Sequence, residues 1–361
     1  MLTISVSNVS AVSAPNSLDY DRLRPVRIWL YVLALGVLLM VLVGGATRLT
    51  ESGLSITSWK PVSGIIPPLT DADWAAEFEA YRQIPQYQQE FAGWMGVEEF
   101  KLIFWWEWLH RFLGRMLGFV FAIPFAIFLV QKRIPKSLLL PLAGLFVLGG
   151  FQGVLGWWMV SSGLSELTSV SQYRLAVHLA AACILLMALV WVARSLERPI
   201  AAARHASKGW GLAIWGLVGL LFVQIVAGAF VAGLDAGSSH NTWPLMEGAL
   251  VPDGLFGLEP LWRNLFEDVM TVQFNHRIIA YLLTAYIAVL WWWGRAHPGY
   301  QGVHGWMPRI AIITLLQVAL GIATLLTVVN IPLALGHQAL AFMLIAMVIA
   351  YLADMKRVSE W

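Results

Sequence analysis

The sequence predicts an all-α integral membrane protein, in which eight transmembrane helices form two pseudo-symmetric four-helix bundles that arose by tandem duplication. Three observations lead to this prediction: an apolar composition, apolar runs of membrane-spanning length, and a repeated pattern of residues. The 361 residues are 59% hydrophobic and 12% charged, with a mean hydropathy of +0.70. A soluble chain of this length needs more polar surface to cover its core, so the composition excludes that class.

Apolar runs long enough to cross a bilayer recur along the whole chain. The hydrocarbon core is about 30 Å thick and a helix rises about 1.5 Å per residue, so a spanning helix needs about 20 apolar residues. Runs bounded by charge, Pro or Gly predict helices near 28–47, 101–130, 137–160, 172–194, 210–232, 271–293, 308–329 and 333–354. We divide the chain into a tail at 1–27, an N-terminal repeat at 28–200 and a C-terminal repeat at 201–361.

The distribution of Lys and Arg predicts the orientation. These residues gather before the first span and in the connections after the second, fourth and sixth, whereas the two long connections are acidic. Basic connections face the cytoplasm. We therefore predict a multi-pass protein of the bacterial inner membrane, or of the mitochondrial inner membrane in a eukaryote, with both termini cytoplasmic. The first residues lack the basic start and long apolar stretch of a cleavable signal peptide.

The two halves resemble each other beyond their hydropathy. The segment GGATRLTESGLSITSWKPVSGIIPP follows the first span, and GAFVAGLDAGSSHNTWPLMEGALVP follows the fifth. At one constant offset the matched pairs are Gly44/Gly228, Glu51/Asp235, Gly53/Gly237, Trp59/Trp243, Gly64/Gly248 and Pro68/Pro252. Later matches are His110-Arg111 with His276-Arg277, Gln152 with Gln317, and His178 with His337. Each half holds an even number of spans, so the repeats have parallel topology about an axis along the membrane normal.

Four of the eight histidines lie inside predicted spans, on the second and fourth helices of each half: His110, His178, His276 and His337. All four helices start on the predicted outer side, so the four imidazoles lie at similar depth. Ionisable residues in a membrane usually face the bundle interior. Two histidines on facing helices can ligate one haem iron from both sides, so the pattern predicts one haem site in each half.

Other interpretations of the histidines and of the single cysteine also follow from the residues. Any one intramembrane histidine can hydrogen-bond a neighbouring helix instead, but four in duplicated pairs favour haem. Zinc is disfavoured because no Cys, third His or carboxylate completes either pair. Cys183 lies in an apolar run and predicts a small core residue, with no intrachain disulfide.

A carboxylate breaks the symmetry between the halves. Glu107 stands three residues before His110 and shares its helical face, whereas the matched position before His276 is Gln273. This difference favours chemistry in the N-terminal half, where Glu107 would manage protons or stabilise a developing positive charge. The C-terminal half would hold a resident electron-transfer or structural haem. The structural alternative is an ion pair between Glu107 and Arg111, four residues later.

Arginines near the outer ends of the spans are candidates for contacts with anionic haem propionates. They are Arg48, Arg111, Arg174 and Arg277. The alternative for each is that its side chain simply reaches the lipid headgroups.

The pattern resembles the haem A synthase family over essentially the whole chain. The resemblance rests on E-x-x-H-R in the second helix, on the single histidines of the fourth, sixth and eighth, and on GGATRLTESGLSITSWKPVSG together with EWLHRFLGR. It is closest to the branch shared by proteobacteria and mitochondria. Some relatives carry cysteine pairs in the outer connections, and this sequence has none.

The resemblance implies that the methyl group at ring position 8 of haem O is oxidised to a formyl group, giving haem A for cytochrome oxidase. It implies that Glu107 is the catalytic carboxylate and that His110 and His178 form the pocket of the substrate haem. It implies that His276 and His337 are the axial ligands of the iron in a permanently bound haem b cofactor.

The expected partners are the substrate haem O and membrane lipid, with haem O synthase and an electron donor as further candidates. A homo-oligomer is left open, and no nucleic acid is expected. Two other classes of function stay open: a non-enzymatic dihaem cytochrome that relays electrons, and a proton-coupled transporter built on the repeats. The lone Glu107 argues against the relay, which needs no such carboxylate.

Overall fold

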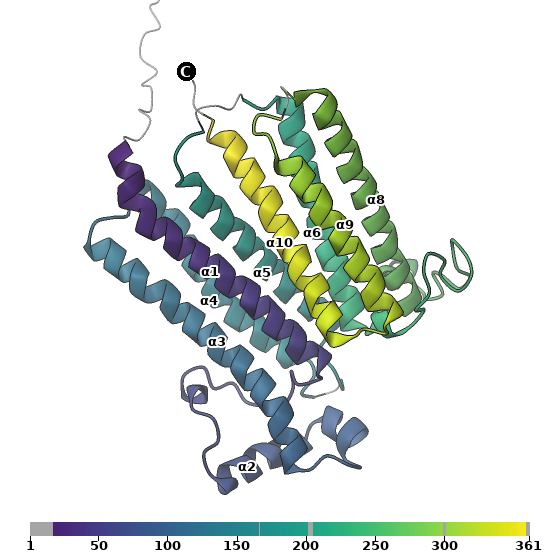
Figure 1. The fold of residues 1–361 in the computed structure, drawn as a ribbon. Coiled ribbons are helices and arrows are strands. Elements are labelled where there is room, and N and C mark those ends of the chain that lie inside the picture. Colours follow the sequence, from purple (N-terminus) through teal and green to yellow (C-terminus); the bar gives the residue numbers. More distant parts are fainter. Residues whose placement is uncertain (1–16, 166, 201–204, 299–300, 359–361) are drawn as a thin grey trace, which may run out of the picture.

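The computed structural model describes residues 17–165, 167–200, 205–298 and 301–358. Within these ranges, eight helices are long and apolar enough to span a membrane (Figure 1). They are α1 (Ser17–Leu49), α3 (Val97–Val130), α4 (Lys136–Val160), α5 (Gln172–Ser195), α6 (Lys208–Gly233), α8 (Val269–Ala296), α9 (Trp306–Leu326) and α10 (Ile331–Lys356). The all-α membrane fold and each of the eight predicted spans are therefore confirmed.

Helix α1 begins at Ser17, well before the predicted start near residue 28. Backbone hydrogen bonding does not require apolar side chains, so the helix continues through the charged segment that hydropathy assigns to the tail. An ion pair between Asp21 and Arg198 links this extension to the end of α5. The remainder of the predicted tail, residues 1–16, lies outside the described residues.

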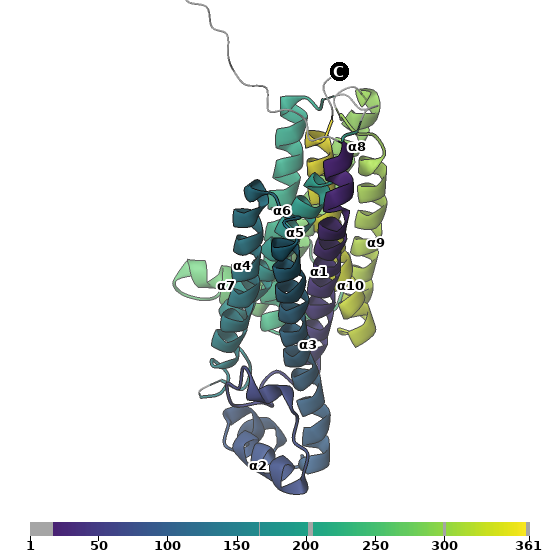
Figure 2. The same cartoon turned by 90° about the vertical axis from the view of Figure 1, so that its left-hand side faces the viewer.

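The helices pack in a pattern that repeats between the halves (Figures 1 and 2). In the N-terminal half α1 packs against α3 and α5, and α4 packs against α5; in the C-terminal half α6 packs against α8 and α10, and α9 against α10. The halves meet where α1 contacts α10, where α5 contacts α6, and where α5 contacts α10. If α1 is matched with α6 and α5 with α10, each contact between the halves has its counterpart, as expected for two pseudo-symmetric bundles. The tandem duplication itself stays a prediction.

One apolar core runs through both halves. Fully buried side chains from α1, α5, α6 and α10 form its centre, among them Leu30, Leu186, Ile214 and Ile345. Cys183 has no exposed surface and lies in this core, as its sequence context predicts. Side chains on the inner helices α5 and α10 are thereby shared between the two bundles.

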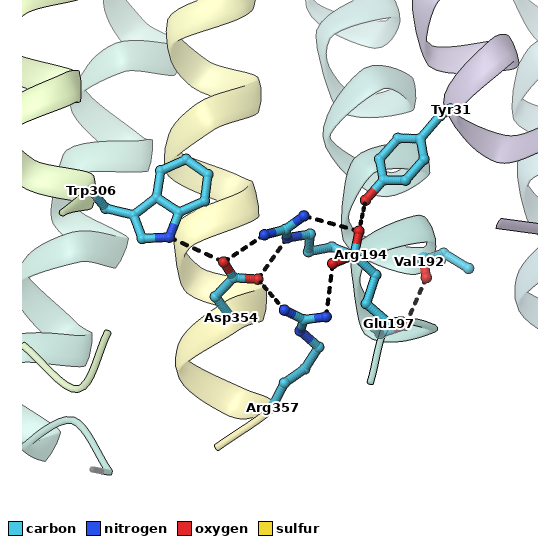
Figure 3. A network of polar contacts seen from close by, with 8 residues as sticks. Tyr31, Val192, Arg194, Glu197, Trp306, Asp354 and Arg357 are labelled. Carbon is cyan, nitrogen blue, oxygen red and sulfur yellow. Dashed lines mark hydrogen bonds and ion pairs between the residues drawn. The ribbon is translucent and has the colours of Figure 1, made fainter. Parts of the chain in front are cut away.

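A polar network joins the halves at the end of the bundle where α1 begins and α10 ends (Figure 3). Arg194 of α5 donates through Nε and Nη2 to the two carboxylate oxygens of Asp354 in α10, over 2.6 and 2.8 Å. The network is extended by Tyr31, Glu197, Trp306 and Arg357. It draws together side chains from α1, α5, α9 and α10, so both bundles are fixed to each other by charge as well as by packing.

Both long connections lie at the opposite end from this network (Figure 1). Helix α3 has 34 residues and is about 20 Å longer than a bilayer core requires. Its first turns carry a small folded unit made of η1 (Ser63–Ile65), α2 (Asp71–Arg82) and η2 (Tyr87–Phe91). The shorter connection before α8 contains η3 (Ala236–Ser238), η4 (Leu261–Arg263) and α7 (Asn264–Glu267). That the two connections share one end agrees with the predicted topology, while the side of the membrane they face stays a prediction.

The folded unit beside α3 was not among the predicted elements. Its centre is aromatic, with the fully buried Tyr81 and Phe100 in tilted contact at 5.2 Å between ring centroids. Thr70 and Asp73 form a reciprocal capping box at the start of α2, and that Thr-x-x-Asp spacing was the available sequence signal.

Candidate functional site

Each intramembrane histidine lies against a glycine of a neighbouring helix in its own half. A Cβ atom at the glycine would lie 2.7 to 3.4 Å from Cε1 of the imidazole in the pairs Gly44/His110, Gly156/His178, Gly228/His276 and Gly321/His337. At Gly44 and Gly321, where this distance is 2.9 and 2.7 Å, a side chain would force the ring to move, whereas at Gly156 the 3.4 Å separation is an ordinary contact. The four imidazoles are thus accommodated between helices, and the contacts repeat at matched positions in the two halves.

The structure places the C-terminal histidine pair in one cavity and the N-terminal histidines at the matched positions. His276 of α8 and His337 of α10 line one cavity of the C-terminal half. In the N-terminal half, His110 of α3 lies against Gly44 of α1 and His178 of α5 lies against Gly156 of α4.

The C-terminal cavity has polar groups suited to holding a haem. Nδ1 of His337 lies 3.1 Å from the backbone carbonyl oxygen of Gln317, which favours the tautomer with a proton on Nδ1 and a lone pair on Nε2. Nε2 of Gln224 lies 3.1 Å from Nδ1 of His276. The side-chain oxygens of Gln224 and Gln317 are buried without a hydrogen-bond partner among the described residues. Two imidazoles in an apolar cavity fit a bis-histidine haem.

The enclosed space of this cavity is about 120 Å³. Pockets for small molecules measure roughly 300 Å³ or more, so binding a haem requires the lining side chains to move outward.

In the N-terminal half, Glu107 is 3% exposed, and both of its carboxylate oxygens accept hydrogen bonds. Its Oε2 accepts from the Ser55 hydroxyl and from the Ile56 backbone N–H, each over 2.8 Å. Its Oε1 accepts from Nε and Nη2 of Arg111, over 3.0 and 2.6 Å. The ion pair that the sequence offered as the structural alternative is therefore present. Four donors fix the direction of the carboxylate beside the histidine pocket.

The matched Gln273 occupies the equivalent place in the C-terminal half. Its Nε2 donates to the backbone oxygens of Ala236 and Ser239, each over 2.6 Å, and its Oε1 accepts from Arg277 over 2.7 Å. The two arginines also donate to backbone oxygens at matched positions. Arg111 donates to those of Ile56 and Ser58, and Arg277 donates to those of His240 and Thr242. In both halves the pair ties the long connection to its helix, and the halves differ in that one pair carries a carboxylate.

All four arginines proposed as propionate contacts have acceptors within the protein. Arg48 forms an ion pair with Asp235 of the other half, and Arg174 donates to the backbone oxygen of Trp158 over 2.6 Å. Nε of Arg48 and Nε of Arg277 are nevertheless buried without a partner among the described residues. These two retain a free donor, and the propionate contacts stay predictions.

Three residues near the pockets were not singled out from the sequence. Arg115 lies one turn beyond Arg111, donates to the backbone oxygens of Lys60 and Pro61, and keeps a buried Nη1 without a partner. Trp243 lines the C-terminal cavity, and its match with Trp59 was the available signal. Gln224 had no such signal, because the matched residue in the first half is Met40.

The turns that follow α1 and α6 also repeat. Glu51 and the matched Asp235 both adopt left-handed backbone conformations, with φ of 54° and 51°. Partial burial raises the pKa of the Glu51 carboxyl, and the negative charge of Glu90 acts in the same direction.

Comparison with known proteins covers most of the chain. Residues 27–349 match the COX15-CtaA family, which is described as cytochrome oxidase assembly protein. A protein of Parvibaculum lavamentivorans is 51% identical over 86% of this chain and 88% of its own length. One of Azorhizobium caulinodans is 52% identical over 92% and 95%, and one of Allorhizobium ampelinum is 50% identical over 96% and 95%. All three relatives are named "Heme A synthase".

Proposed function

The chain belongs to this family of cytochrome oxidase assembly proteins, and on that premise we propose that it makes haem A by oxidising the C8 methyl group of haem O to a formyl group. The observation that carries the proposal is the pairing of two histidine sites with a single buried carboxylate, Glu107, beside one of them. With O2 as the oxidant and the electron donor supplying two electrons in each turn, two successive hydroxylations would convert the methyl to a hydroxymethyl group and then to a gem-diol. Each turn reduces the second oxygen atom of O2 to water, and the gem-diol loses water to leave the formyl group.

In the N-terminal half, His110 and His178 hold the substrate haem. Glu107 lies one turn from His110 on the same face of α3. Because Arg111, Ser55 and Ile56 fix its direction, its carboxylate needs no reorganisation to stabilise positive charge developing at the methyl carbon. The same carboxylate would accept a proton released during oxidation.

In the C-terminal half, His276 and His337 would hold the resident haem b, which supplies one-electron transfer when bound. Gln273 ties down the outer connection there without a carboxylate. Arg48, Arg111, Arg174 and Arg277 are the proposed partners of the propionates of the two haems. We further propose cytoplasmic termini in a bacterial inner membrane, with haem O synthase and an electron donor as partners.

The first test is extraction and mass analysis of haem from cells that make haem O, with and without this protein. We expect haem A only when the protein is present. If only haems B and O are recovered, with reductant in excess and a bis-histidine spectrum in the purified protein, the dihaem electron relay replaces this proposal.

A second test addresses Glu107 directly. The substitution Glu107→Gln copies the C-terminal half, so the protein should fold and keep haem b while haem A formation falls about 100-fold, as for loss of an electrostatic catalytic group. The matched control is Glu247→Gln, since Glu247 is an outer carboxylate paired with His240. Haem A formation at the parent rate by Glu107→Gln would remove Glu107 from the reaction.

A further inference from the structure

The walls of the two histidine pockets differ at matched positions. Helices α8 and α9 contribute Ala280, Thr284, Thr314 and Val318 to the C-terminal cavity. Aligning His110 with His276, and Gln152 with Gln317, places four glycines of α3 and α4 at these positions, namely Gly114, Gly118, Gly149 and Gly153. The side chains that fill this wall in the second half are thus missing in the first.

Three of the four glycines face open space, and Gly114 contacts Met40 of α1. Apart from each glycine's own helical turn, no atom of the described residues lies within 4 Å of a Cβ built at Gly118, Gly149 or Gly153, and at Gly114 the nearest atom is Cε of Met40 at 3.5 Å. Helices α3 and α4 also pack against each other less closely than their counterparts α8 and α9. We call this space between α3 and α4, bounded by the four glycines, the glycine slot.

The glycine slot starts at the level of the imidazoles. Gly114 and Gly118 follow His110 at successive fourth positions and so share its helical face. On α4, Gly149 and Gly153 precede Gly156, which contacts His178. The slot therefore runs about 12 Å from the histidines toward the end where α1 begins, away from Glu107.

The histidine that precedes the slot on α3 also has a buried polar atom without a partner in the described part of the chain, on the edge of the ring that faces Gly44 of α1. Nδ1 of His110 is buried and has no hydrogen-bond partner among the described residues. A buried polar group without a partner is costly, whereas the matched His276 has Gln224 beside its ring. The N-terminal pocket thus combines an unsatisfied imidazole with unfilled apolar space.

We infer that the glycine slot receives the isoprenoid tail of haem O and selects this substrate for the N-terminal half. The inference rests on the proposed function. Haem O differs from haem b by an apolar tail on the ring edge remote from the propionates. With the propionates directed to the outer arginines, that edge faces the slot. Thr314 and Val318 occupy the equivalent space in the C-terminal half and exclude the tail there.

The test places the C-terminal side chains into the slot with Gly149→Thr and Gly153→Val. Purified protein carrying its haem b is titrated with haem O and, separately, with haem B, and binding at the N-terminal site is followed optically. We expect the affinity for haem O to fall about tenfold or more, as overpacking of a filled site does, while the affinity for haem B is unchanged. The control Gly219→Leu adds bulk at an open position of α6 that matches the exposed Leu35, and it should change neither affinity.

Retention of haem b reports that each variant is folded, and Gly153→Ala should give a smaller loss in the same direction. Three results would each overturn the inference about the slot. They are an unchanged haem O affinity in the variants, an equal loss of affinity for both haems, and no haem O binding by the parent. A parent that binds haem O with the expected selectivity but forms no haem A would instead contradict the proposed reaction alone.

Discussion

Glu107 and Arg111 show how a single pair serves both architecture and the proposed chemistry. Arg111 donates to the carboxylate and to the backbone oxygens of Ile56 and Ser58, so one guanidinium holds α3 and the connection after α1 together. Removing one partner of a buried pair leaves the other charge uncompensated, which costs more than the intact pair contributes.

We therefore predict that Arg111→Ala destabilises the protein by about 3 kcal/mol, measured as a fall in the thermal unfolding midpoint in detergent. Adding Glu107→Gln should restore part of the loss, because the unpaired carboxylate is then gone. Strictly additive effects of the two substitutions, with no recovery in the double variant, would contradict the coupling.

At the scale of elements, α7 is tied to the other half through its last residue. Glu267 accepts from Nε of Arg263 over 2.8 Å and from the hydroxyl of Tyr173 in α5 over 2.7 Å. These hydrogen bonds, from Arg263 first and then Tyr173, lower the pKa of the Glu267 carboxyl. Because the pKa is lower in the folded state, the ionised carboxylate stabilises the docked helix fully at pH values above 4.5, the ordinary pKa of a Glu carboxyl.

As the pH falls from 4.5 through the lowered pKa of Glu267, we expect α7 to loosen from α5. Hydrogen exchange across residues 259–268, corrected for its intrinsic pH dependence, should rise over that window. The variant Tyr173→Phe removes one of the two donors, so its loosening should begin at higher pH. Exchange that is flat from pH 6 to pH 3 would show that this contact does not hold α7.

At the scale of the whole molecule, the two bundles are fastened to each other at one end. The side chain of Asp354 is 3% exposed and lies between Arg194 and Arg357 (Figure 3). The pair Arg198–Asp21 joins elements of the same end but is 63% and 67% exposed. Exposed pairs contribute little, whereas a buried charge without its partner is costly.

Asp354→Asn should consequently lower the thermal midpoint by several degrees, with a cost of about 3 kcal/mol, because Arg194 and Arg357 lose their shared counter-charge. Arg198→Ala should change stability by no more than about 0.5 kcal/mol. The two midpoints are compared in the same detergent with haem b bound. If the two substitutions lowered the thermal midpoint equally, burial of Asp354 would not explain how strongly this network stabilises the protein.

The sequence by itself determined the spans, the repeat pattern and the histidine positions. A bilayer of fixed thickness demands long apolar runs, so each span could be located from composition alone. Glu107 and its symmetry-breaking partner Gln273 were visible because the repeats provide an internal comparison. The early start of α1 was missed because the apolar run does not mark where the helix begins.

Only the tertiary structure decided which groups meet. Two donors to Glu107, Ser55 and Ile56, lie about 50 positions away in the sequence. Gln224 reaches His276 from another helix, and α2 folds on contacts among aromatic residues. The four slot glycines are plain in the sequence, but the open space that faces Gly118, Gly149 and Gly153 is a property of the packing between α3 and α4. Local patterns and membrane thickness fix the elements, whereas partners and empty volume depend on residues that become neighbours only when the helices assemble.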